Sequence, residues 1–373
     1  MTHIKDTFKL NCGATLPNRL VMAPMVAQGS TVDGFITQED LDYFDIRSNV
    51  AGMIITGAAA VEDGGRGFDK QIGVSSDAHV KGLTKLATTI KKDGNKAIMQ
   101  LYHGGREAVG GYNLFQEVVA PSAIDFPFLP YVPRELTEDE ILRIIKSFGK
   151  ATKRAIDSGF DGVEIHGANH YLLQQFFSNY SNHRTDQWGG SLENRMRFSL
   201  EILKEVKSVV KTYAKEDFIV GFRFCPEEIH GENIGFKLED SIAWMDRVVE
   251  IGVDYIHVSI FTGFSDKAVD ASKSYGETFK SRFNEKTAVI IVSNVFNLED
   301  ATAALKHGDL VGIGRGALIE PDFAGKIMRD EASTIVTRVT NDNFNDLKWP
   351  EGLSAWFSEE DNPLPPVPGF SDL

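Results

Sequence analysis

The chain has 373 residues, of which 42% are hydrophobic and 25% charged, and its formal net charge at pH 7 is −14. This composition excludes a disordered or collagen-like polypeptide, and the acidic surplus argues against binding to nucleic acid or to an anionic membrane, because both require a basic surface. We therefore expect a globular protein that acts on a small molecule, with no nucleic acid and no membrane as a partner.

Short apolar runs of the length of buried strands recur along the chain. They are nearly continuous in Val, Ile, Leu and Phe, which is typical of parallel strands covered on both faces. The expected strands are 19–25, 51–59, 96–104, 160–167, 218–224, 253–260, 288–294 and 309–316.

Amphipathic segments of helical length lie between these strands, at 37–49, 79–94, 137–159, 191–215, 237–252 and 297–308. Thr137 and Glu140 form the capping-box pattern that begins a helix. Four glycines stand where left-handed residues end helices: Gly94, Gly159, Gly252 and Gly308. The βα repeat with eight strands predicts an α/β fold, a single eight-fold βα (TIM) barrel. An open, doubly wound sheet is the alternative, because alternation alone does not prove closure.

Three segments are longer than simple connections require. Residues 105–136 follow the third strand and residues 170–190 follow the fourth, and loops at these strand ends build the sites of barrel enzymes. The tail ends in "EEDNPLPPVPGFSDL", which is too rich in proline for a helix at its end. We expect residues 1–330 to form one barrel domain and residues 331–373 to be a C-terminal extension that packs on the barrel, not a separate domain.

The cysteine content and the N-terminal sequence limit which metal centres the chain can form and where in the cell we expect it. Cys12 and Cys225 are the two cysteines, and two thiols cannot assemble a four-cysteine zinc site or an iron–sulfur cluster within one chain. Residues 1–13 lack the basic and apolar regions of an export signal, and no run of 18 apolar residues occurs. We expect a cytoplasmic protein.

Polar residues at the C-terminal ends of the expected strands need an explanation, because strand interiors do not require them. In a closed barrel they would meet at one mouth. They are Gln100, Tyr102, His103, His166, Asn169, Tyr171, Arg223, Ser293, Asn294 and Arg315. One such residue alone is more often structural, and Arg223 could simply pair with Glu164. Their recurrence at equivalent positions favours a functional site.

The types of residue in this set narrow the chemistry. Glycine amides and an arginine in "VGIGRG" (311–316) lie where barrels of this kind commonly hold a phosphate. Gln100 and Arg223 could bind the polar edge of a flat heterocycle. Paired carboxylates for glycoside hydrolysis, a strand-end lysine for Schiff-base chemistry and a convincing metal-ligand spacing are not evident, so we expect no metal site.

These residues, together with "VMAPM" (21–25), "QLYHGGR" (100–106) and "SNYSNHRTDQWGGSLENRMRF" (178–198), resemble the old yellow enzyme family of FMN-dependent ene-reductases. The last stretch, directly after the His-x-x-Asn-x-Tyr element, is highly specific, whereas "GIGRG" alone is a weak motif. The resemblance covers about residues 8–330. It implies a single barrel with FMN at its mouth, reduced by NADH or NADPH.

The resemblance also implies a role for each matching residue. The expected flavin contacts are Pro24, Met25, Val26, Ala58, Gln100, His166 and Arg223, and the expected phosphate contacts are Ser293, Asn294, Gly314 and Arg315. His166 and Asn169 would bind the activating oxygen of an electron-poor alkene such as an enone, and Tyr171 would donate the proton. Val26 departs from branches that place cysteine or threonine there, because it can offer only its backbone.

Two alternatives stay open. One is a flavin-binding barrel that senses or stores flavin without catalysis, and the other is a flavin-free barrel enzyme that acts on a phosphorylated substrate. The sequence leaves open the physiological alkene, the choice between NADH and NADPH, and whether the chain forms a homo-oligomer.

Overall fold

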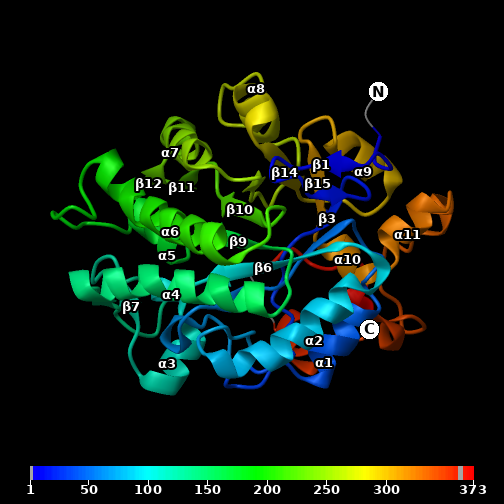
Figure 1. The fold of residues 1–373 in the computed structure, drawn as a ribbon, viewed down its shortest axis with the longest axis horizontal. Coiled ribbons are helices and arrows are strands. Elements are labelled where there is room, and N and C mark those ends of the chain that lie inside the picture. Colours follow the sequence, from blue (N-terminus) through cyan, green and yellow to red (C-terminus); the bar gives the residue numbers. More distant parts are fainter. Residues whose placement is uncertain (1–2, 360–363) are drawn as a thin grey trace.

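The computed structural model describes residues 3–359 and 364–373 and contains a closed parallel barrel (Figure 1). Its strands are β3 (Leu20–Met22), β4 (Met53–Ile55), β6 (Lys96–Tyr102), β9 (Gly162–Gly167), β10 (Ile219–Phe224), β13 (Tyr255–Val258), β14 (Ala288–Val292) and β15 (Leu310–Ile313). The hydrogen-bonded order runs β4-β3-β15-β14-β13-β10-β9-β6, and β6 pairs back with β4. The TIM barrel is therefore confirmed, and the open-sheet alternative is wrong.

The helices surround the barrel (Figure 1). The six that the sequence predicts are α1 (Gln38–Asp45), α2 (Val80–Ile90), α4 (Glu138–Asp157), α6 (Leu192–Tyr213), α7 (Leu238–Ile251) and α9 (Leu298–Ala304). The capping box of α4 is present: the Glu140 N–H donates to Thr137 Oγ1, and the Thr137 N–H donates to the Glu140 carboxylate.

Three of the four expected helix-ending glycines have a positive φ: Gly94, Gly159 and Gly252. Gly308 is a wrong prediction, because α9 already ends at a right-handed Leu305. The position of Gly308 leaves little space for a side chain, because a Cβ there would lie 3.0 Å from the Val289 carbonyl oxygen.

Six short helices were not predicted: α3 (Val109–Phe115), α5 (Leu172–Phe177), α8 (Tyr275–Phe283), α10 (Arg315–Ile319), α11 (Phe323–Met328) and α12 (Glu351–Phe357). Five of these helices have seven residues or fewer, which is too few turns to show a clear helical period, whereas α8 has nine. Helix α10 also corrects the expected strand 309–316, because β15 ends at Ile313 and the chain turns into a helix directly afterwards.

A hairpin of β1 (Phe8–Lys9) and β2 (Thr15–Leu16) precedes the barrel and packs its apolar residues against the barrel interior. Leu10 and Leu16 share a buried cluster with the strand residues Val21, Met53, Ile55, Ile98, Ile219, Tyr255, Ala288, Ile290 and Leu310. Several of these residues begin their strands, so the hairpin fills the N-terminal end of the barrel. The strands' C-terminal ends are left as the mouth.

The C-terminal segment packs against the barrel through the buried Arg47 of the turn after α1. Its guanidinium donates to the carbonyl oxygens of Ala317, Leu318 and Leu347 at 3.0, 3.2 and 2.9 Å. The Trp349 indole also donates to the Leu318 carbonyl oxygen, at 3.1 Å. The domain boundary at residue 330 stays a prediction.

None of the helices within residues 3–359 and 364–373 combines the length and apolar composition that crossing a bilayer demands.

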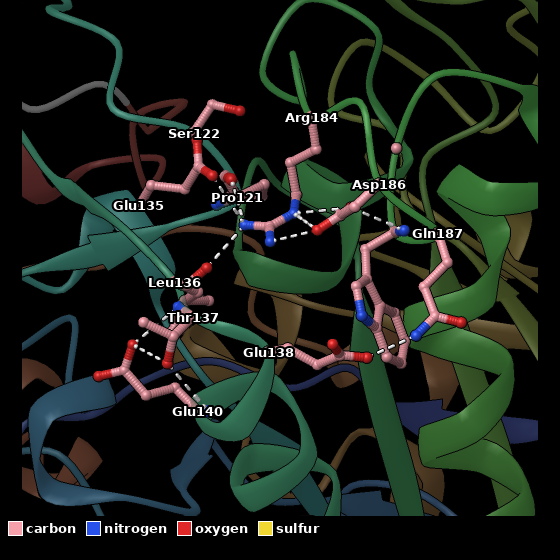
Figure 2. A network of polar contacts seen from close by, with 12 residues as sticks. Pro121, Ser122, Glu135, Leu136, Thr137, Glu138, Glu140, Arg184, Asp186 and Gln187 are labelled. Atoms are coloured by element: carbon pink, nitrogen blue, oxygen red, sulfur yellow. Dashed lines mark hydrogen bonds and ion pairs between the residues drawn. The ribbon is translucent and has the colours of Figure 1, made fainter.

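Arg184 joins the two long segments that follow the third and fourth barrel strands (Figure 2). Its Nη1 donates to the carbonyl oxygens of Pro121 and Leu136 at 3.1 and 2.7 Å, and its Nη2 pairs with Asp186 at 2.6 Å. The Asp186 carboxylate also accepts from the Trp188 N–H at 2.9 Å. Arg184 is 8% exposed, so its hydrogen bonds to the two carbonyl oxygens are shielded from water, whereas Asp186 is partly exposed. Together these contacts fix the base of both segments.

We predict that Arg184→Lys lowers the free energy of unfolding by about 2 kcal/mol, because one ammonium group cannot reproduce the guanidinium fork and leaves buried carbonyl oxygens without donors. Urea unfolding followed by circular dichroism measures this. Arg247→Lys, on an exposed part of α7, is the matched control and should change stability by less than about 0.5 kcal/mol. Equal effects of both substitutions would contradict the role given to Arg184.

Candidate active site

The barrel register brings the predicted polar residues of neighbouring strands together at the mouth. Gln100 on β6 pairs with Glu164 on β9, and His166 on β9 pairs with Arg223 on β10. Arg223 in turn pairs with His257 on β13. Because side chains at every second position of a strand share a face, these five residues form one contiguous polar patch inside the barrel.

The Glu164 carboxylate lies at the centre of this patch and is fully buried. Gln100 Nε2 donates to Oε1 at 2.7 Å, and His257 Nδ1 contacts Oε2 at 3.0 Å. Burial opposes ionisation of Glu164, but the contact with His257, the charge of Arg223 and the Gln100 hydrogen bond outweigh it and lower the pKa of the carboxyl. Glu164 is therefore a buried anion.

Arg223 is the buried cation nearest to that anion along the strands. Its Nη2 donates to Ser259 Oγ at 3.0 Å, so the ion pair with Glu164 that the sequence left open is replaced by a hydrogen bond to a neighbouring strand end. Burial lowers the pKa of Arg223, although a guanidinium stays charged in proteins. Its Nε is buried and has no hydrogen-bond partner within residues 3–359 and 364–373, so an N–H donor is available to a ligand.

Gln100 is the matching acceptor. Because its Nε2 donates to Glu164, the amide oxygen is the atom left for another partner. Gln100 and Arg223 therefore offer an acceptor and a donor from two strands, as a flat heterocycle with both kinds of edge atom would require.

His166 is a neutral hydrogen-bond donor. The Ala168 N–H donates to its Nδ1 at 3.2 Å, so the neutral ring carries its proton on Nε2. Burial holds the pKa of His166 well below its ordinary value, and the nearby charge of Arg223 acts in the same direction. The ring therefore donates a hydrogen bond without carrying a charge.

Asn169 is held with its amide oxygen engaged. Ser259 Oγ donates to Oδ1 at 2.8 Å, and Cys225 Sγ approaches the same oxygen at 3.6 Å. The backbone at Asn169 is left-handed, with φ of 57°. Because Oδ1 is occupied, Nδ2 is the group left to donate to a ligand.

Tyr171 directly precedes α5 and lies against Tyr102 and His166, with ring centroids 4.5 and 5.1 Å away. Val26 and Ala58 pack in the same cluster. Burial, followed by the charge of Glu107, raises the pKa of Tyr171 to about 12, so the phenol keeps its proton at neutral pH.

The predicted residues of the first two strands lie beside this cluster. Pro24 is buried, and Met25, Val26 and Ala58 line a small hollow. Gly57 permits the close approach of the two segments, because a Cβ there would lie 2.5 Å from the Met25 carbonyl oxygen.

The four predicted phosphate contacts gather where β14 and β15 end. Ser293 and Asn294 are consecutive residues with positive φ, and Gly314 directly precedes α10. Arg315 donates to Asn294 Oδ1 at 2.6 Å and to the Pro366 carbonyl oxygen at 2.8 Å. The Ser293 hydroxyl donates to the Phe261 carbonyl oxygen at 3.0 Å. As placed, the side chains of Ser293, Asn294 and Arg315 bind protein atoms, and their contact with a phosphate stays a prediction.

Sequence reasoning missed three residues that orient the site: Cys225, His257 and Ser259. A signal was present in "YIHVSI" (255–260), where polar residues alternate inside an apolar strand, as expected of side chains that enter a barrel interior. Cys225 carries no such signal, because a thiol at a strand end is usually a packing residue.

Comparison with known proteins assigns this geometry to a family. Residues 8–333 match the model of the NADH:flavin oxidoreductase / NADH oxidase family. A probable NADH-dependent flavin oxidoreductase of Bacillus subtilis is 38% identical over 351 residues, which are 93% of this chain and 94% of that protein. The NADH:acrylate oxidoreductase of Vibrio harveyi is 40% identical over 338 residues, 89% of this chain but 34% of that protein. The chain thus spans about a third of the length of this relative.

Solved structures agree with the match. The old yellow enzyme homologue from Zymomonas mobilis superposes with a TM-score of 0.77 at 26% identity, over 94% of this chain and 99% of that one. Morphinone reductase in complex with tetrahydroNAD superposes with a TM-score of 0.78 at 26% identity, over 94% of this chain and 97% of that one.

The buried anion at the centre of the site gives a prediction for stability. Glu164→Gln should lower the free energy of unfolding at pH 7 by about 3 kcal/mol, because it leaves the buried Arg223 charge without its compensation. Urea unfolding at several pH values measures this. Glu201→Gln on α6, where the side chain is partly exposed, is the control and should have an effect below about 0.5 kcal/mol.

The sign of the pH dependence follows from the lowered pKa. Ionised Glu164 stabilises the fold fully above its unfolded pKa of about 4.3, and this stabilisation is lost as the pH falls through the lower folded pKa. The gap between wild type and Glu164→Gln should therefore shrink in acid. A gap that stays constant down to the acid transition would rule out an ionised Glu164.

Proposed function

This chain belongs to the NADH:flavin oxidoreductase / NADH oxidase family, that of old yellow enzyme, and from this premise we propose that it reduces electron-poor alkenes. It is an oxidoreductase that uses FMN with NADH or NADPH. The membership removes the flavin-free alternative. What remains to be proposed is the substrate class and the residues that act on it.

The residues at the mouth fit a flavin. The partnerless Nε–H of Arg223 and the remaining oxygen of Gln100 match the acceptor and donor atoms on the polar edge of the ring. Val26 and Ala58 supply an apolar wall on one side, and the left-handed backbone at Ser293 and Asn294 supplies donors for the phosphate. When bound, FMN supplies the hydride chemistry.

The observation that carries the proposal is the pair of neutral donors at the mouth. The Nε2–H of His166 and the amide Nδ2 of Asn169 are both left to donate, because their other polar atoms are occupied by Ala168 and Ser259. Hydride addition to a conjugated alkene pushes negative charge onto the activating oxygen, so two donors placed there stabilise the transition state more than the substrate.

Tyr171 is the proposed proton donor. Its phenol is protonated at neutral pH and its ring packs edge-to-face against His166. A phenol in this place can deliver a proton to the alkene carbon that does not receive hydride.

Relatives support an activated alkene as the substrate. The Vibrio harveyi relative is named for acrylate, and a Klebsiella pneumoniae relative, 40% identical over 339 residues, is named for fumarate. In both molecules a carbonyl group withdraws electrons from the double bond. The chain covers about a third of each protein, so the alkene that it reduces is a proposal, with enones included.

A catalytic assay tests the proposal. In anaerobic stopped-flow experiments on the FMN-loaded protein, NADH or NADPH should bleach the flavin absorbance, and 2-cyclohexenone or acrylate should restore it. Bleaching without restoration by any electron-poor alkene would favour the flavin-sensor alternative.

Substitution of the proton donor separates the two halves of the reaction. Tyr171→Phe should change the rate of flavin reduction by NADPH by no more than about twofold. It should lower the rate of flavin reoxidation by the enone about 100-fold, which is a usual rate contribution of a general acid. Tyr213→Phe, on the exposed end of α6, is the matched control and should change neither rate. Loss of FMN binding in Tyr171→Phe would show that the residue holds the cofactor instead.

A further inference from the structure

A cluster of possible metal ligands lies beside the mouth and takes no part in the proposed reaction. It consists of His170 on the turn between β9 and α5, and of Glu228 and His230 on β11 (Glu228–His230), which pairs with β12 (Asn233–Phe236). One ligand atom from each residue lies within 4.8 Å of the others. We propose that these three residues bind a zinc ion.

Glu228 supports a cation site because it is a buried carboxylate with no permanent positive partner among the described residues. It is 2% exposed, and its one ion-pair contact there is with His170, at 3.7 Å. Ser178 Oγ donates to Oε1 and Gln174 Nε2 donates to Oε2, both at 2.6 Å. A buried charge requires compensation, and hydrogen bonds of this kind orient the carboxylates that ligate metals.

His170 supports the site through its backbone. It has φ of 63° directly after Asn169 at 57°, a left-handed pair without glycine. A Cβ atom disfavours this region, and residues held in it concentrate at functional sites. The chain thus places an imidazole where a glycine would be less strained.

Gln174 is a second polar group that orients this cluster. It is fully buried, its Nε2 lies 3.2 Å from His170 Nδ1, and the same Nε2 donates to Glu228 Oε2 at 2.6 Å. One buried amide therefore holds two of the three proposed ligands in place.

Two imidazoles and one carboxylate are a ligand set that zinc prefers. Bonds of about 2.0–2.2 Å in a tetrahedron place ligand atoms about 3.4 Å apart, so ligand atoms that now lie as much as 4.8 Å apart must approach by up to about 1.4 Å. His230 is exposed, and its ring lies tilted with its centroid 5.0 Å from that of His170, so its side chain can turn to close this gap. The positive charge of Arg106 is near His230 but is paired with Glu107 at 3.0 Å.

Zinc at this place would restrain the active-site turn. His170 stands between Asn169 and Tyr171, so an ion would tie that turn to the β11–β12 hairpin. This consequence rests on the proposed function, whereas binding of the ion does not.

Isothermal titration of ZnCl₂ into the FMN-loaded protein, after dialysis against a chelator and then chelator-free buffer, tests the site. Wild type should bind one ion per chain, and His230→Gln should weaken binding at least about tenfold. The exposed His183→Gln is the matched control and should bind as wild type does. Equal binding by wild type and His230→Gln, or no binding by wild type, would overturn the proposal.

Hydrogen exchange provides a second measurement that does not depend on activity. Zinc should slow exchange of the backbone amides of residues 168–171 in wild type and leave them unchanged in His230→Gln. Slowing in both proteins would place the ion elsewhere. Alkene reduction without zinc should be the same in wild type and His230→Gln, so a failure of the proposed reaction and a failure of the zinc site are distinguishable.

Discussion

The burial of one carboxylate, Glu164, imposes the arrangement of the barrel mouth. An ion this deep inside a protein is tolerated only when hydrogen bonds and an opposite charge surround it. Gln100 and His257 provide the contacts, and Arg223 provides the charge. Gly221 has no side chain because the Tyr255 ring occupies that space: a Cβ would lie 2.1 Å from Tyr255 Cζ. The anion thus decides which atom of Gln100 remains available to a cofactor.

A chain of hydrogen bonds connects Arg223, a proposed flavin contact, with Asn169, a proposed substrate contact. Arg223 donates to Ser259, and Ser259 donates to the amide oxygen of Asn169. Each hydroxyl or amide in such a chain has its direction fixed by the previous donor. The orientation of Asn169 therefore depends on a cationic residue of the adjacent strand, and the two proposed binding functions share one hydrogen-bond network.

The sequence predicts the fold and the position of the site because both follow from local patterns. Near-continuous apolar runs mark the eight strands, and a polar residue that ends such a run, as His166 does, marks the mouth. Orientation is not local: the free donor of Asn169 depends on Ser259, which lies far away in the sequence. Short helices such as α10 are not predicted, because one or two turns are too short to show a helical period. The prediction for Gly308 is wrong because glycine is required both at helix ends and where packing leaves no space for a side chain.

The hydrogen bonds of Arg184 to main-chain oxygens have a consequence for which parts of the sequence can vary. Arg184 donates hydrogen bonds to the main-chain oxygens of Pro121 and Leu136 in the segment after the third strand. Every residue type has such an oxygen, so these bonds do not depend on the side chains at the two positions. The exposed residues between those two anchors, such as Ala123, Asp125 and Pro127, can therefore exchange their side chains while the ends of the stretch stay in place, whereas Ser122 and Phe126 are buried. Sequence variation at these exposed positions is thereby uncoupled from the attachment of the loop to the barrel.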